Sequence, residues 1–449
     1  MGRPPYSLLA LLPLLLCVGL SSLRSGSAAA ASITAGTPDG SELWGRCRHR
    51  HRLLLGCNCN YVQGASGVGF GNFKEVGPLD VNLQPRNSTW LQKADLIFVD
   101  NPVGVGYSYV EDDSLLVTTD WQQAADATTL LKALVQEVPT LRSSPLFLVA
   151  ESYGGKYAAT LGVSVARAAR AGELNVTLGG VAFGDSWISP EDFTLSYTPL
   201  LLSVSRLDDN ASDEANKMAE TVMDQIAAGN FTDAEGSWND LLGFIGTRSG
   251  HVDVYNFLDG SLDDEASASA APGSSPNTAA KPMNMMEEYS RRLSGGGDGS
   301  DSNTIGGIMN GVIKEKLKII PKDLEWVEEN IAVYNALVDD IMRPRIDEID
   351  ELLSYGVNVT VYNGQLDIIC STIGAEAWVQ KLKWDGLKTF LSLPRQSLHC
   401  SPSIGTKGFV RSYKNLHFYW ILGAGHYVPE DQPCIALSMI GSITQSPAS

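Results

Sequence analysis

The sequence predicts an α/β fold built around a parallel sheet, and three observations lead to this prediction. Short apolar runs are bounded by turn signals, and stretches with helical periodicity lie between several of them. This alternation of strand and helix is typical of a parallel sheet covered by helices on both faces. Hydrophobic residues make up 44% of the 449 residues and charged residues 19%, which fits a packed core and excludes disorder throughout the chain.

The expected strands and helices follow one another along the chain. Strands are expected at Asp95–Val99, Leu146–Ala150, Gly179–Phe183, Asn358–Tyr362 and His417–Leu422. Helices are expected at Thr119–Glu137 and Lys156–Ala171. Each of these helices lies between two expected strands, as a crossover connection between parallel strands requires.

Residues 1–30 are expected to form a cleavable signal peptide. Arg3 precedes the apolar run Leu8–Leu20, and the small residues Ser25–Ala30 follow it. The run is shorter than the roughly 18 apolar residues that a membrane anchor needs. We therefore expect a protein of the secretory pathway, either extracellular or vacuolar or lysosomal, without stable membrane insertion.

The rest of the chain divides into a core in two parts and an insertion. Residues 31–190 and 326–449 carry all the expected strands. Residues 191–325 instead show helical segments around Asp213–Ala228 and Ala234–Phe244 and are expected to form a helical insertion, or cap. Within the insertion, residues 259–303 are rich in Asp, Ser, Ala and Gly and are expected to form a low-complexity loop.

Two further features fit the secretory pathway. Five N-x-S/T sequences predict glycosylation at Asn87, Asn175, Asn210, Asn230 and Asn358. One C-terminal disulfide is expected among Cys370, Cys400 and Cys434, although the sequence leaves the connectivity open.

The charge balance narrows the choice of partners. The formal net charge is −18, from 33 Lys and Arg against 51 Asp and Glu. Such a chain repels phosphate, so we expect neither a nucleic acid nor an anionic membrane as partner. The oligomeric state is not predicted.

A candidate nucleophile stands at the end of an expected strand. The run Leu146–Ala150 leads into Glu151-Ser152-Tyr153-Gly154-Gly155 and then into an expected helix. A serine on a sharp strand-to-helix turn, flanked by small residues, is typical of the nucleophile elbow, here with Ala150 in place of the usual first glycine. The alternative is a serine in an ordinary turn between strand and helix.

A candidate base and a candidate acid follow two other strands. His426 lies among glycines in Gly423–Pro429, directly after the strand expected at His417–Leu422, and Asp367 follows the strand expected at Asn358–Tyr362. The order Ser152, Asp367, His426 is that of the α/β-hydrolase triad, so we expect the α/β-hydrolase fold. This chemistry needs no cofactor.

Several motifs together resemble the serine carboxypeptidase family, most closely retinoid-inducible serine carboxypeptidase and the plant serine carboxypeptidase-like proteins. They are Gly69–Leu79, Phe98–Ser108, Glu151–Gly155, Gly184–Pro190, Tyr362–Asp367 and the His426 loop. The resemblance implies hydrolysis of the C-terminal bond of peptides or proteins through an acyl-enzyme. In this mechanism Ser152 attacks, His426 transfers the proton, and Asp367 orients the imidazole.

The resemblance also implies roles for residues beside the triad. Glu75 and Glu151 match a pair of acids that bind the terminal carboxylate of the substrate. A carboxyl group kept protonated by its neighbour can donate a hydrogen bond to that carboxylate, so activity is expected in acid and should fall toward neutral pH. The backbone N–H groups of Tyr153 and Gly64 match the oxyanion donors.

The sequence departs from the family before Ala65. Tyr61–Gly67 stands where the family has a longer Trp-x-Asn/Gln-Gly-Gly-Pro-Gly stretch, and the preceding segment is too short for the first strands, so we expect a truncated N-terminal part of the sheet. An error in the gene model at residues 46–63 is the alternative. No metal site is predicted, because the nearby histidines and cysteines lack the usual ligand spacing: Cys47, His49, His51, Cys57 and Cys59.

Three functions remain open at this point. The first is a serine carboxypeptidase, and the second is a related acyltransferase that passes the acyl group to an alcohol. The third is a non-catalytic binding protein, because the segment that would complete the oxyanion hole is shortened. The sequence does not indicate which C-terminal residue would be removed.

Overall fold

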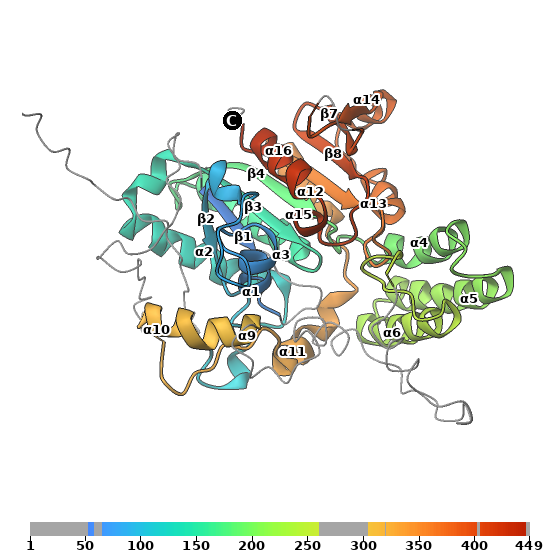
Figure 1. The fold of residues 1–449 in the computed structure, drawn as a ribbon, viewed down its shortest axis with the longest axis horizontal. Coiled ribbons are helices and arrows are strands. Elements are labelled where there is room, and N and C mark those ends of the chain that lie inside the picture. The colour runs from blue at the N-terminus through green and yellow to red at the C-terminus, as the bar shows by residue number, and fades with distance from the viewer. Residues whose placement is uncertain (1–52, 58–64, 260–303, 319, 402–404, 446–449) are drawn as a thin grey trace, which may run out of the picture.

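The computed structural model describes residues 53–57, 65–259, 304–318, 320–401 and 405–445. Within this part of the chain, one sheet has the strand order β2-β1-β3-β4-β5-β8-β7-β6 (Figure 1). The strands are β1 Leu53–Cys57, β2 Asp95–Phe98, β3 Pro145–Glu151, β4 Thr177–Gly184, β5 Asn358–Gly364, β6 Gln396–Leu398, β7 Gly408–Tyr413 and β8 Leu416–Ile421. The predicted signal peptide lies outside the described residues.

Parallel pairing brings the ends of the central strands to one edge of the sheet. Neighbouring strands from β2 through β1, β3, β4 and β5 to β8 are parallel, whereas β7 and β6 continue the sheet in antiparallel pairs. The register pairs Glu151 with Gly184, Gly184 with Tyr362, and Gly364 with Ile421. The loops after β3, β4, β5 and β8 therefore begin side by side, which is where sites form in such sheets.

All five expected strands are confirmed to within two residues at each end. Three strands were not expected. β1 has a short apolar run in an atypical segment, yet it pairs with β2 and β3 inside the sheet. β6 and β7 form the edge beyond β8, and their partly exposed residues give a weak hydrophobic signal. Apart from β1, the segment of the expected truncation lies outside the described residues.

The helices of the described residues have a wide range of lengths. The α-helices are α1 Val68–Phe70, α2 Asp120–Glu137, α3 Gly154–Arg170, α4 Pro190–Ser203, α5 Asp209–Ala227, α6 Phe231–Arg248, α9 Ile305–Ile308, α10 Lys314–Leu317, α11 Ile331–Ile341, α12 Ile346–Ser354, α13 Thr372–Val379, α14 Leu387–Ser392, α15 Val428–Asp431 and α16 Pro433–Ile443. Shorter helical turns are η1 Gly71–Glu75, η2 Trp90–Gln92, η3 Asp113–Leu115, η4 Pro139–Ser143 and η5 Met309–Ile313. No helix among the described residues is long and apolar enough to cross a membrane.

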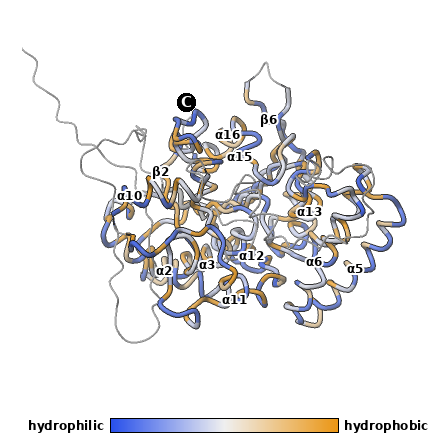
Figure 2. Tube along the Cα trace, turned by 60° about the horizontal axis from the view of Figure 1, so that its bottom comes forward, coloured by the Kyte–Doolittle hydropathy of each residue, from blue (hydrophilic) through white to orange (hydrophobic). Residues whose placement is uncertain are grey.

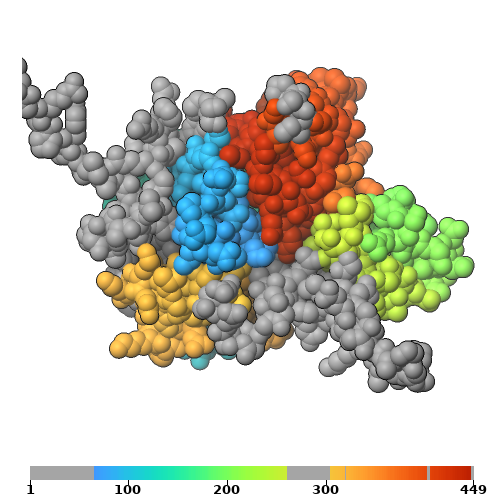
Figure 3. Space-filling model, viewed as in Figure 1, coloured from blue at the N-terminus to red at the C-terminus, as the bar shows by residue number. Residues whose placement is uncertain are grey.

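The helices α4, α5 and α6 pack on one another and form a lobe beside the sheet, drawn in green in Figure 3. The described residues of 191–325, namely 191–259 and 304–318 with 320–325, contain no strand. The trace of α5 is mostly in hydrophilic colours in Figure 2, as expected for a helix at the outside of the lobe. The low-complexity loop expected at 259–303 lies, apart from Asp259, outside the described residues.

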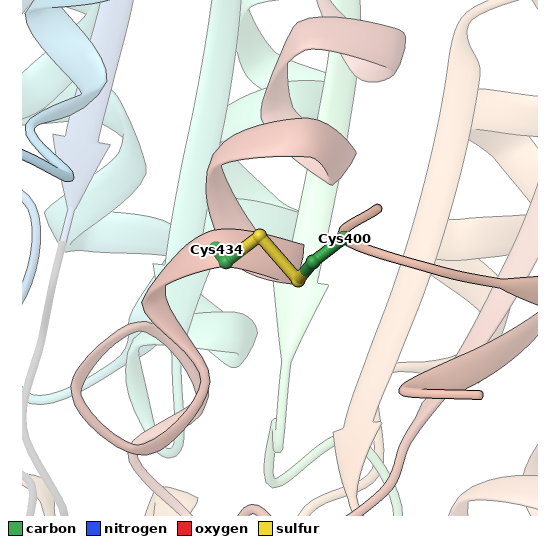
Figure 4. Close-up of a disulfide and its surroundings, with 2 residues drawn as sticks. All are labelled: Cys400 and Cys434. Carbon is green, nitrogen blue, oxygen red and sulfur yellow. A yellow bond between two sulfur atoms is a disulfide. The ribbon is translucent and has the colours of Figure 1, made fainter. Parts of the chain in front are cut away.

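A disulfide joins Cys400, which follows β6, to Cys434 in the first turn of α16 (Figure 4). One C-terminal bridge was expected among three cysteines, and the structure confirms it with Cys400 and Cys434. Cys370 is a buried free cysteine. The bridge fixes the chain just beyond the loop that carries His426.

A buried charge cluster connects α2, α3 and the turn between α11 and α12. Nε of Arg345 donates to Oδ2 of Asp120 at 2.8 Å, and its Nη2 donates to Oδ2 of Asp340 at 2.6 Å. Nζ of Lys156 lies 3.7 Å from Oδ2 of Asp120 and donates to the carbonyl of Asp340. All four side chains are buried, so each charge is stabilised almost entirely by its partners.

We expect Arg345→Met to destabilise the protein by about 3–5 kcal/mol, because it leaves the carboxylates of Asp120 and Asp340 short of a buried partner. Urea unfolding followed by tryptophan fluorescence measures the change. Lys383→Met is the matched control, because Lys383 pairs with Asp347 at the surface, and it should leave the midpoint unchanged. Equal stability of wild type and Arg345→Met would contradict the assigned role of the cluster.

Candidate active site

The backbone at Ser152 forms a tight turn between β3 and α3. Ser152 has a φ of +56°, in the left-handed region that non-glycine residues rarely adopt. A Cβ on Gly155 would lie 2.3 Å from Ser186, so only glycine allows this close approach. The N–H of Ser152 donates to the carbonyls of Gly184 and Asp185 at 3.0 and 3.1 Å. The loop after β4 thus holds the candidate nucleophile in place.

His426 and Asp367 are in direct contact. Nδ1 of His426 lies 2.7 Å from Oδ2 of Asp367, and both side chains are fully buried. The N–H of His426 donates to the carbonyl of Tyr255 at 2.8 Å. A Cβ on Gly364 would lie 1.9 Å from the carbonyl oxygen of Gly425, so the loops after β5 and β8 are in close contact.

The three triad candidates lie at the same edge of the sheet. Ser152 directly follows β3, Asp367 follows β5, and His426 follows β8. In the strand order these strands are neighbours except for β4, which lies between β3 and β5. The register of the parallel strands, which pairs Glu151 with Gly184, Gly184 with Tyr362 and Gly364 with Ile421, brings the ends of these strands to the same edge. The fold therefore joins residues that are far apart in the sequence.

Glu75 and Glu151 form a buried carboxyl pair beside the elbow. Glu75 is at the end of η1, Glu151 is the last residue of β3, and their side chains share a hydrogen bond. Burial and the nearby Glu430 raise the pKa of Glu75 to about 8. Burial and the charge of Glu75 raise the pKa of Glu151 well above its usual range. Two carboxyl groups in contact cannot both be charged at low cost, so the pair holds a proton.

The described residues next to the candidate oxyanion donors are firmly anchored. The O–H of Tyr153 donates to Oδ1 of Asp120 at 2.9 Å, which ties this residue to the buried charge cluster. The N–H of Ser66 donates to the carbonyl of Glu328, and its hydroxyl donates to the carboxylate of Asp100. Gly64, the other candidate donor, lies outside the described residues.

Cys370 lies close to Asp367 and His426, and ligand atoms of the three lie within 4.8 Å of one another. Two ligands of one tetrahedral zinc ion would be roughly 3.4 Å apart, given bonds of about 2.1 Å. The 2.7 Å between Asp367 and His426 is the length of a direct hydrogen bond. We therefore assign these groups to hydrogen bonding and assign no metal site.

Sequence reasoning missed three buried acids that support this edge. Asp100 accepts hydrogen bonds from Ser66 and from the N–H of Tyr107, and Asp120 accepts one from Tyr153. Asp185 interacts with Asp367. Asp100 lies within the motif Phe98–Ser108 and Asp185 within Gly184–Pro190, so these motifs could have indicated both residues. Asp120 is the first residue of an ordinary helix, and no sequence signal indicated it.

Comparisons with known proteins agree with one another. A family model described as serine carboxypeptidase matches residues 64–446. The chain is 53% identical over 390 residues to serine carboxypeptidase-like 51 of Arabidopsis thaliana, covering 86% of this chain and 83% of the relative. It is 40% identical over 447 residues to retinoid-inducible serine carboxypeptidase of Mus musculus, covering 95% and 96%.

The fold is also found among solved structures. The crystal structure of Kex1(delta)p, described as a prohormone-processing carboxypeptidase from Saccharomyces cerevisiae, matches with a TM-score of 0.71 at 21% identity, over 96% of this chain and 91% of that chain. This likeness concerns the fold, and it confirms the expected α/β-hydrolase architecture. The resemblance drawn from the motifs is confirmed by the family model and the relatives.

Proposed function

The chain belongs to the serine carboxypeptidase family, and on this basis we propose that it hydrolyses the C-terminal bond of peptides or proteins through Ser152, His426 and Asp367. The observation that carries the proposal is the buried contact between His426 and Asp367, at the edge where the strained turn presents Ser152. These are the groups that acyl transfer by a serine requires.

The reaction takes two acyl transfers. Asp367 accepts a hydrogen bond from Nδ1 of His426, which leaves Nε2 to take the proton of Ser152 as its Oγ attacks the carbonyl carbon. The N–H of Tyr153 stabilises the oxyanion, and His426 then gives its proton to the departing amino group. Water repeats these steps on the acyl-enzyme and frees Ser152.

Recognition of the C-terminus is assigned to the buried pair Glu75 and Glu151. The proton held by this pair lets one carboxyl group donate a hydrogen bond to the terminal carboxylate of the substrate. Because burial raises both pKa values, the pair keeps a proton at acid and neutral pH and loses it as the pH rises further, which moves the fall in activity that the sequence predicts toward neutral pH to alkaline pH. Binding of the substrate should follow the same course.

We also propose that the protein passes through the secretory pathway and is glycosylated. Asn87, Asn175, Asn210 and Asn230 are exposed, as enzymatic glycosylation requires. Asn358 differs, because it lies within β5 and its Nδ2 donates to the carbonyl of Gly179 on β4 at 2.9 Å. We therefore assign glycans to the first four sites.

The proposed activity is tested with Ser152→Ala. A fluorophosphonate should label the wild type at Ser152, and a blocked dipeptide at acid pH should release its C-terminal amino acid. The variant should lose labelling, and its kcat should fall by roughly 10⁶-fold. A wild type that takes no label would be a binding protein, and labelling without release of the amino acid would favour the acyltransferase.

The pH dependence tests the carboxyl pair. For a peptide substrate, kcat/KM should fall as the pH rises through about 8, the value to which the pKa of Glu75 is raised, because Glu75 then becomes a carboxylate that repels the terminal carboxylate of the substrate. The double variant Glu75→Gln and Glu151→Gln cannot titrate, so its KM should rise about tenfold in acid while its pH dependence flattens. A neutral ester without a terminal carboxylate is the control. An unchanged peptide profile in the double variant would refute the assignment.

Glycopeptide mass spectrometry of the protein from a eukaryotic secretory host tests the assignment of glycans. Enzymatic deglycosylation in ¹⁸O-labelled water should mark Asn87, Asn175, Asn210 and Asn230, and it should leave Asn358 unmarked because the sheet shields that side chain. A marked Asn358 in folded protein would contradict the structural argument, and an absence of marks at all five sites would contradict the proposed route.

A further inference from the structure

We propose that Asp185 is a positioning residue of the triad, a protonated carboxyl group that donates a hydrogen bond to Asp367 and holds it against His426. The inference rests on the proposed function, and it adds a residue that stands outside the three that act on the substrate. It also gives the hydrolytic centre a source of pH dependence separate from the pair Glu75 and Glu151.

The backbone of Asp185 links the strands that carry the triad. Asp185 directly follows β4 and has a φ of +37°, a conformation that asparagine and aspartate tolerate better than most residues. Its N–H donates to the carbonyl of Tyr362 on β5 at 2.8 Å, and its carbonyl accepts from the N–H of Ser152 at 3.1 Å. The residue is thus fixed between the nucleophile and the strand that leads to Asp367.

The two side-chain oxygens of Asp185 differ in their surroundings. Oδ1 accepts from the N–H of Gly364 at 2.8 Å and from Nδ2 of Asn363 at 3.3 Å. Oδ2 of Asp185 and Oδ1 of Asp367 are both buried, and neither accepts from an N–H or O–H group of the described residues. The two side chains contact each other as hydrogen-bonded carboxyl groups. One shared proton satisfies both oxygens.

The proton belongs to Asp185. Oδ2 of Asp367 already accepts a hydrogen bond from Nδ1 of His426 at 2.7 Å, so Asp367 is the acceptor in both of its side-chain contacts. Asp185 is fully buried, and burial together with the charge of Asp367 raises its pKa well above the usual range. The N–H of Gly364, which donates to Asp185, opposes this rise without reversing it.

Most of the titratable groups that face Asp185 increase its affinity for a proton. They come from several elements: Glu151 at the end of β3, Tyr362 on β5, Asp367 and Cys370 after β5, and Asp431 on α15. His426 after β8 contacts Asp367. In the proposed mechanism, His426 gains a positive charge when it takes the proton of Ser152. A second negative charge beside Asp367 would hold that proton on His426 and repel Asp367 from its position, so ionisation of Asp185 should stop the reaction.

The test uses Asp185→Asn, because an amide keeps both hydrogen bonds to Oδ1 and donates permanently to Asp367. Activity is measured with a neutral blocked amino-acid ester, whose binding does not need the pair Glu75 and Glu151. Asp192→Asn is the matched control, since Asp192 is also buried but contacts Ser189 and Lys381 instead of the triad. Fluorophosphonate labelling of Ser152 is followed in parallel.

In the wild type and in Asp192→Asn, kcat/KM for the ester should fall at alkaline pH by about tenfold per pH unit above the midpoint. In Asp185→Asn the activity in acid should stay within about threefold of wild type, and the alkaline fall should disappear. Asp185→Ala should lose roughly 10- to 100-fold at every pH, as expected for a lost hydrogen bond to a charged group.

Two outcomes would overturn the inference. One is an unchanged alkaline fall in Asp185→Asn, and the other is a folded Asp185→Asn that is inactive at every pH, because either would mean that Asp185 does not act as a neutral donor. A neutron structure of the wild type at acid pH gives a second test that needs no variant, since it should show a deuteron between Asp185 and Asp367, and its absence would also overturn the inference. A wild type that takes no fluorophosphonate label would refute the proposed function instead.

Discussion

Four carboxyl groups are buried at one edge of the sheet, and the site depends on how their negative charge is limited. Glu75 contacts Glu151, and Asp185 contacts Asp367. A buried carboxylate without compensation costs several kcal/mol, so such groups either bind protons or contact cations. When two such carboxyl groups lie side by side, one proton held between them removes the repulsion between two negative charges. In the proposed mechanism, one pair then recognises a carboxylate and the other orients a histidine.

This arrangement requires close approach of four loops, and the parallel sheet provides it. The register of β3, β4, β5 and β8 fixes where each loop leaves the sheet, and the loop after β4 holds the elbow by backbone hydrogen bonds. Elsewhere on the molecule, charge is neutralised by cations, as in the cluster around Arg345. That cluster reaches the site through the hydroxyl of Tyr153. The hydrogen bond from Tyr153 to Asp120 therefore links the buried charge cluster to the edge that carries the candidate triad.

Much of the fold could be predicted because its central strands carry a strong local signal. Strands such as β3 and β5 are buried along most of their length and read as apolar runs between turns. β1 was missed although it lies inside the sheet, because only Leu53–Leu55 form a continuous apolar run and the basic stretch Arg46–Arg52 before them is not a turn signal. β6 and β7 were missed because antiparallel edge strands with exposed residues look like loops in a sequence.

The sequence by itself determined the α/β class, the order of the candidate nucleophile, acid and base, and the family, since these depend on local runs and on motifs of adjacent residues. Only the tertiary structure decided which buried acids interact with one another and which cysteines form the bridge. Asp185 and Asp367 are in contact because the sheet places β4 beside β5, although the helices α4 to α6 and α9 to α12 separate them along the chain. Proton affinity depends on burial and on neighbours in space, and neither can be read from residues that are adjacent in sequence.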